Sequence, residues 1–337
     1  MLKARGRIEG STSNKVGYYR LLQWLAVAAV ADWIFARTLS RSAIFMPKSA
    51  AILTGFQAML SLGNFAANVT SLLAITTMAW MAWRLALKGH RPLPIAIGAL
   101  LIFNLGAVLF APSASVTLTY HLIAMAAILM IVRPVVKGSQ GAAHTAGVLV
   151  PAAAVFASEL HQAAAALSVV FNMGSPFNLG FTAFNMGEAL VVASGLAFGW
   201  WMRPRRSERW IWVVAAVPTV ALVSLYLGAP SISSVLAIWS LGLTLFLPWP
   251  LYALSFWALI AAILTGLKRG HTIGLAIPML VAGGYASQLS TQLFLSLIAL
   301  YLLAGKDELS DARQTDTMDA TSALWIRLPS GSKVEPQ

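Results

Sequence analysis

The amino-acid sequence predicts an all-α protein, a polytopic integral membrane bundle of about ten transmembrane helices arranged as hairpins. Hydrophobic residues make up 58% of the 337 residues and charged residues only 10%, whereas a soluble domain carries about a quarter charged residues. Long apolar runs alternate with short basic islands along the whole chain. Because a bilayer core offers the backbone no hydrogen-bond partners, and the runs are too long for barrel strands, we expect each run to be helical.

Positive charge marks one end of each predicted hairpin. The connections between the basic islands carry almost no charge, and cytoplasmic loops of membrane proteins carry an excess of Lys and Arg. The pattern therefore predicts a cell (plasma or inner) membrane protein with the islands and both termini in the cytoplasm. The net charge of +12 then serves topology and contact with anionic lipid, and we expect no nucleic acid partner. The islands are residues 3–20, 84–91, 133–137, 203–209 and 268–269, and the uncharged connections are 111–115, 174–178 and 229–233.

The chain divides into three parts by composition. Residues 1–18 form a basic cytoplasmic segment, residues 19–304 the helical bundle, and residues 305–337 a polar tail that we expect to be mostly disordered. The first apolar run also resembles a signal peptide that would be cleaved after Ala31. Since apolar sequence resumes directly beyond Asp32, we interpret this run as the first span.

Three predicted spans, residues 49–83, 231–267 and 272–304, are longer than the about 20 residues that a membrane helix needs, and they leave nine or eleven spans as alternatives. Residues 231–267 contain Pro248 and Pro250, which should break or kink a helix. Residues 272–304 are interrupted at Gly283 and Gly284.

Isolated carboxylates are the strongest functional signal. Apart from Asp32 at the end of its run, only Glu159 and Glu188 are acidic residues inside apolar runs. A charge there costs about 2.5–3.5 kcal/mol by insertion scales, so such residues usually face the bundle interior or a water-filled path. We predict that Glu159 and Glu188, with His161 near the first, bind a small solute or ion.

The tetrapeptide Phe-Asn-x-Gly occurs three times between residues 171 and 187. Its asparagines, Asn172, Asn178 and Asn185, could hold an unwound segment whose free backbone groups bind the same solute. The alternative is that Asn and Gly only join helices through close contact and hydrogen bonds. A further polar stripe, which includes Gln288 and Gln292, could line the same cavity or form a helix contact.

Two histidines, His121 and His161, lie within apolar runs and support a different hypothesis. On facing helices they could hold a haem, as in a membrane anchor of a respiratory complex. The chain has no cysteine and no clustered histidine motif for a metal.

These patterns favour a secondary transporter or channel for a small solute or ion that uses intramembrane carboxylates. The main alternative is a non-catalytic membrane subunit, a quinone- or haem-binding anchor of a respiratory or other redox complex. A membrane-embedded lipid-processing enzyme is the third hypothesis. We predict no catalytic residue, no metal site and, outside the redox alternative, no cofactor. The expected partners are the lipid bilayer, the solute or ion, and a second copy of the chain or other membrane subunits.

Overall fold

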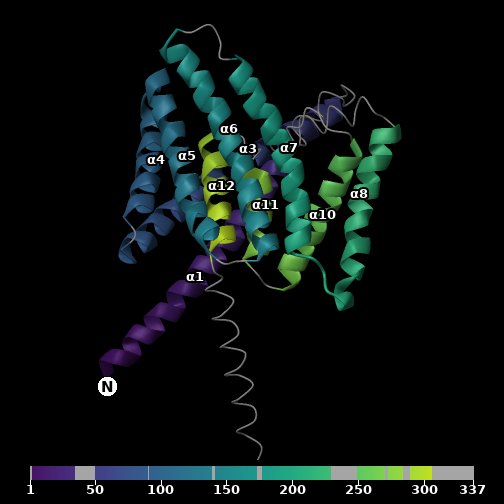
Figure 1. Ribbon diagram of the computed structural model, residues 1–337, viewed down its shortest axis with the longest axis horizontal. Coiled ribbons are helices and arrows are strands. Elements are labelled where there is room, and N and C mark those ends of the chain that lie inside the picture. The colour runs from purple at the N-terminus through teal and green to yellow at the C-terminus, as the bar shows by residue number, and fades with distance from the viewer. Residues whose placement is uncertain are drawn as a thin grey trace, which may run out of the picture.

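The computed structural model confirms an all-α architecture, since every regular element in its described residues is a helix (Figure 1). It describes residues 2–34, 50–89, 91–138, 141–172, 177–228, 249–269, 272–283 and 289–305, with the backbone alone at 2–16, 177–188 and some other positions. The helices are α1 (Leu2–Asp32), α3 (Ala50–Leu87), α4 (Pro92–Leu109), α5 (Ala114–Lys137), α6 (Ala142–Val170), α7 (Phe177–Trp201), α8 (Trp210–Gly228), α10 (Trp249–Lys268), α11 (Ile273–Gly283) and α12 (Leu289–Ala304), with the short 3₁₀ helix η3 (Arg206–Glu208) between α7 and α8.

The helices end where the charge pattern predicted. Basic islands fall at the α3–α4, α5–α6 and α7–α8 connections, and uncharged segments fall at α4–α5 and α6–α7. Figure 1 shows the α5–α6 and α7–α8 connections at one end of the bundle, together with the start of α1 and the end of α12. The α6–α7 connection lies at the opposite end. The bundle therefore has one basic end, which we call the basic end below.

Local sequence signals set several of these boundaries. The hydroxyl of Ser113 accepts a hydrogen bond from the Val116 N–H and caps α5. Helix α10 begins at Trp249 and helix α11 ends at Gly283. Pro248 and Gly284, which adjoin these ends and belong to the predicted breaks, lie outside the described residues. Helix α1 runs unbroken through residue 18, so the basic N-terminal segment belongs to the same helix as the apolar run that follows it.

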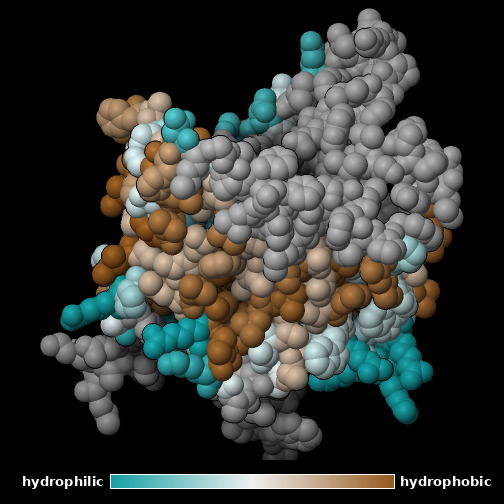
Figure 2. Space-filling model, turned by 45° about the horizontal axis from the view of Figure 1, so that its top comes forward, coloured by the Kyte–Doolittle hydropathy of each residue, from teal (hydrophilic) through white to brown (hydrophobic). Residues whose placement is uncertain are grey.

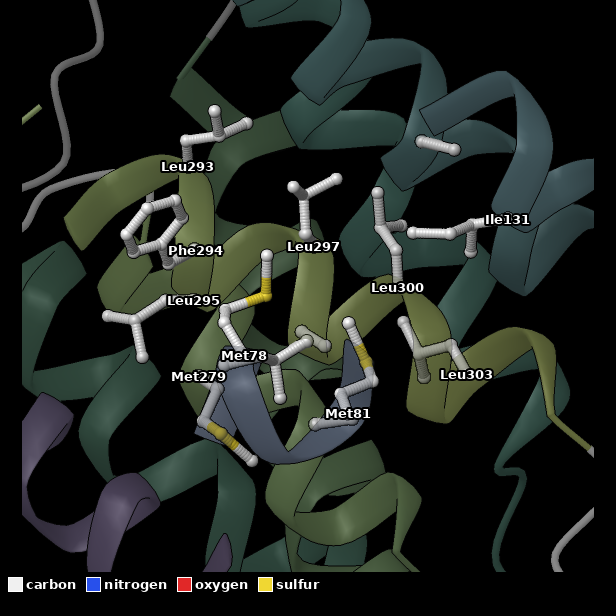
Figure 3. Packing of buried hydrophobic residues seen from close by; sticks show 14 of the residues in the cluster. Met78, Met81, Ile131, Met279, Leu293, Phe294, Leu295, Leu297, Leu300 and Leu303 are labelled. Carbon is white, nitrogen blue, oxygen red and sulfur yellow. The ribbon is translucent and has the colours of Figure 1, made fainter. Parts of the chain in front are cut away.

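Helix α12 lies at the centre of the core. It packs against α3, α5, α6 and α11, and it is apolar on almost all sides, as expected for a helix that other helices surround. Figure 3 shows its leucines beside the flexible side chains of Met78, Met81 and Met279, which suit irregular gaps. Its fully or almost fully buried side chains are Leu293, Phe294, Leu295, Leu297, Ile298, Ala299, Leu300 and Leu303.

Small residues let α7 and α10 approach closely. A Cβ added at Gly199 would lie 2.7 Å from the Cβ of Ala258, and one at Gly195 would lie 2.7 Å from the backbone oxygen of Ser255. The Ser255 hydroxyl donates a 2.7 Å hydrogen bond across the same interface, to the carbonyl of Val192. Glycines four residues apart are a common contact surface between membrane helices.

The outer surface of the bundle is apolar. Figure 2 shows hydrophobic residues in a continuous region, with hydrophilic residues gathered below it. Large side chains such as Trp24, Leu72 and Ile102 are each about two-thirds exposed or more, an arrangement that a soluble monomer rarely tolerates. Four helices of the described residues are long and apolar enough to cross a membrane: Ser61–Leu87, Ala114–Lys137, Ala142–Val170 and Pro250–Lys268.

Candidate functional site: a buried histidine–glutamate pair

His121 of α5 and Glu159 of α6 form a direct contact inside the bundle. The Nδ1 atom of His121 lies 2.7 Å from Oε2 of Glu159. Both residues are buried, with 6% and 8% of their surfaces exposed. A titratable pair so poorly solvated is costly unless its members bond one another, and this pair does so.

The hairpin geometry explains why two residues far apart in sequence meet. His121 precedes the end of α5 at Lys137 by sixteen residues, and Glu159 follows the start of α6 at Ala142 by seventeen. Because both helices rise about 1.5 Å per residue from the same connection, the two side chains reach the same depth. The sequence pattern grouped Glu159 with Glu188, and it left His121 either as a haem ligand or as a histidine satisfied by a neighbouring helix, so the specific pair was missed. Equal distances from the shared connection are the signal that would have found it.

Tyr120 adds a third polar group to this site. Its ring meets the His121 ring edge to face, with centroids 5.4 Å apart. The hydroxyl is buried and has no hydrogen-bond partner among the described residues. Such a group costs about 1–3 kcal/mol in desolvation, so its position needs an explanation beyond packing.

The pair can change its charge without losing its hydrogen bond. With Nδ1 donating to an ionised Glu159, the second ring nitrogen, Nε2, can either carry a proton or not. The pair is neutral when Nε2 is protonated and carries one negative charge when it is not. The chemistry available here is therefore the binding and release of a proton, or the recognition of a solute by a carboxylate, an imidazole and a phenol.

The other predicted site residues of the described chain occupy different positions on the helices. His161 is half-buried on α6, two residues after Glu159 and hence on a different face of the helix. Asn172 is exposed in the turn after α6, where its φ of 46° is left-handed. Gln292 is half-buried on α12. Asp32 is buried at the end of α1.

Several predicted residues cannot be compared with this site. The side chains of Asn178, Asn185 and Glu188 lie outside the described residues, as does all of Gln288. Their backbone nevertheless corrects one expectation. Asn178 and Asn185 lie within the continuous helix α7, so the second and third copies of Phe-Asn-x-Gly do not form an unwound segment. Residues 173–176, between the first two copies, lie outside the described residues.

Another buried carboxylate, Glu208, lies at the basic end. Glu208 of η3 accepts a 2.6 Å hydrogen bond from Arg269 and a 3.0 Å bond from the Arg205 backbone N–H, and Lys268 lies 3.7 Å from it. The bond from Arg269, followed by that from Arg205, lowers the pKa of Glu208 from its ordinary 4.5 to about 2. This cluster ties the α7–α8 connection to the end of α10. Glu208 lies within the basic island at residues 203–209, and the sequence pattern did not indicate its role.

Comparison with protein-family models, with curated proteins and with solved structures found no match to this chain. The site is therefore interpreted from its own geometry.

Proposed function

We propose that the chain is a multi-pass membrane protein that works as a secondary transporter or channel for a small solute or ion. The observation that carries the proposal is the contact between His121 and Glu159, a titratable pair buried between helices α5 and α6. Ionisable residues inside membrane helices are rare, and they usually bind a substrate or belong to an ion pathway. The apolar outer surface and the four long apolar helices support the membrane location.

The finer topology belongs to the same proposal. About ten helices would cross the bilayer as hairpins, with the basic end and both termini in the cytoplasm of a cell whose inner or plasma membrane holds the protein. The gathering of Arg and Lys at one end of the bundle supports this orientation.

Solute flux into vesicles tests the proposal. The purified full chain would be reconstituted in vesicles of phosphatidylethanolamine and phosphatidylglycerol and offered small ions, organic acids and amines under imposed gradients. We expect the wild-type protein to transport one class of these solutes. The flux of that class should fall at least about tenfold in Glu159→Gln and in His121→Gln, since each variant removes a group that binds the solute or ion. Glu208→Gln is the matched control, because it removes a paired carboxylate at the basic end and should retain the flux.

The redox-subunit alternative would be recognised in the same preparation. A reduced-minus-oxidised absorbance spectrum with a haem band, together with a stoichiometric soluble redox partner, would replace the transporter proposal. A colourless protein that still moves no solute from the panel would also count against transport.

A further inference from the structure

The contact between His121 and Glu159 persists in two protonation states. A neutral imidazole and an imidazolium can both donate from Nδ1 to the ionised carboxylate, so the 2.7 Å bond needs no rearrangement between them. Proton binding takes place at Nε2, whose lone pair accepts H⁺ and turns the imidazole into an imidazolium. The net charge of the pair then rises from −1 to zero, and proton release reverses the change.

The surroundings of the pair make this change of charge matter. On its own helices the pair is flanked by buried apolar side chains, Ala124 and Met125 on α5 and Ala163 on α6. A net charge in such surroundings is poorly solvated. The charged state of the pair therefore gains more from contact with water than the neutral state does, and the two states differ in how readily the site opens to water. A site of this kind can link proton occupancy to the conformation of a bundle.

The helices packed against the pair carry few other titratable groups. On α5 and α6 these are Tyr120 beside it, His161 on a different face of α6, and the basic-end residues His144, Arg133 and Lys137. Arg133 follows His121 by twelve residues, about 18 Å along the helix. Helix α12 contributes Tyr301, near its end at Ala304. Helix α4 contributes none between Pro92 and Leu109, and α7 contributes Glu188, whose side chain lies outside the described residues.

We infer that His121 and Glu159, with the buried Tyr120 hydroxyl beside them, form a proton-binding site whose ligand H⁺ is the coupling or transported ion; this rests on the proposed transport function. The Glu159 carboxylate already accepts a hydrogen bond from an imidazole nitrogen. A hard cation needs a shell of several oxygen ligands, whereas a carboxylate and an imidazole are suited to bind a proton. The unpaired Tyr120 hydroxyl supplies a donor for the solute or water that exchanges with the proton.

Nuclear magnetic resonance on the histidines of the full chain in detergent tests the site without transport. The chain has five histidines, and His121→Gln identifies the signal of interest by its loss. We expect the His121 imidazole signals to change with pH in a single step. Glu159→Gln should move that step, and Glu208→Gln should leave it in place. His121 signals that do not respond to pH, or that respond identically in Glu159→Gln, would overturn the inference.

Vesicle flux separates this inference from the proposed function. With a pH-sensitive dye inside, we expect flux through the wild-type protein to move protons, and collapse of the proton gradient by an ionophore to reduce solute flux at least about tenfold. Solute flux that follows a sodium gradient and ignores the ionophore would overturn the proton site and leave the transporter standing. A His121 signal that titrates in a protein without any flux would keep the site and refute the transporter.

Discussion

At the scale of single residues, the site depends on two side chains, His121 and Glu159, neither of which can be replaced alone without leaving the other unsatisfied. His121 and Glu159 are each buried, and each provides the other's hydrogen bond. A buried pair adds little stability by comparison with apolar side chains of the same volume, but removal of one member leaves the other unsatisfied. The pair therefore serves function more than stability, and this difference can be measured.

Single and double apolar replacements of the pair should not add. We expect His121→Leu and Glu159→Met each to lower the free energy of unfolding by about 3–5 kcal/mol, because each strands a buried polar partner. The double variant should lose much less than the sum, since it strands neither group. Denaturant unfolding of the four purified proteins in detergent gives the cycle. Losses that simply add would show that the two side chains do not interact in the folded protein.

Tyr120 allows stability and function to be separated at the same site. Its hydroxyl makes no hydrogen bond among the described residues, so Tyr120→Phe should leave the free energy of unfolding unchanged or raise it by about 1–3 kcal/mol, the desolvation cost of the buried group. Under the proposed function, the same variant should lose solute or proton flux. A stable variant with normal flux would assign the hydroxyl no role in transport.

At the scale of helices, the bundle is held together at two levels along its axis, by small residues at one and by a polar cluster at the other. The α7–α10 interface depends on the absence of side chains at Gly195 and Gly199. Nearer the basic end, Glu208 joins η3 to the end of α10 through Arg269. Both contacts involve α10, which the first joins to α7 and the second joins to η3, and each predicts a distinct loss of stability.

Alanine at the α7 glycines should destabilise the protein, although alanine favours helices. At Gly199 the new Cβ would lie 2.7 Å from that of Ala258, and overpacking of this kind costs about 1–3 kcal/mol. Gly98 and Gly106 of α4 are matched controls, because a Cβ added there has no atom within 4 Å. Their alanine variants should gain about 0.5–1 kcal/mol from helix propensity alone. Thermal unfolding in detergent would refute the interpretation if all these variants behaved alike.

The Glu208 cluster predicts a pH dependence with a defined sign. Glu208 has a pKa of about 2 in the folded chain and an ordinary value of 4.5. Its ionised form therefore stabilises the fold above pH 4.5, and this contribution is lost as pH falls toward 2. We expect the melting temperature of wild type to exceed that of Glu208→Gln near neutral pH, and the difference to shrink below pH 4.5. A difference that stays constant down to the lowest pH at which the protein is soluble would argue against the cluster.

At the scale of the whole molecule, the charge pattern of the sequence predicted the helix connections better than it predicted the functional site. Basic islands located the α3–α4, α5–α6 and α7–α8 connections, because topology depends on local composition that each segment carries by itself. The site depends instead on which helices pack together and at what register. The sequence showed that Glu159 and His121 were unusual, but their 38-residue separation hid the contact, and Glu208 was passed over because its partner Arg269 lies on another element.

The predicted orientation in the membrane places the two ends of the bundle on opposite sides of the bilayer. The chain is suited to a test of this orientation because it contains no cysteine. A single cysteine introduced at an exposed position is therefore the only thiol in the chain that a labelling reagent can modify. Ser115 lies near the α4–α5 connection and Ser207 in η3 at the basic end, and both are exposed. Since positive charge favours the cytoplasmic side, a membrane-impermeant maleimide should label Ser115→Cys in intact cells and Ser207→Cys only after the cells are opened. The reverse pattern would invert the orientation, and labelling of both in intact cells would contradict the placement of the two positions on opposite faces of the membrane.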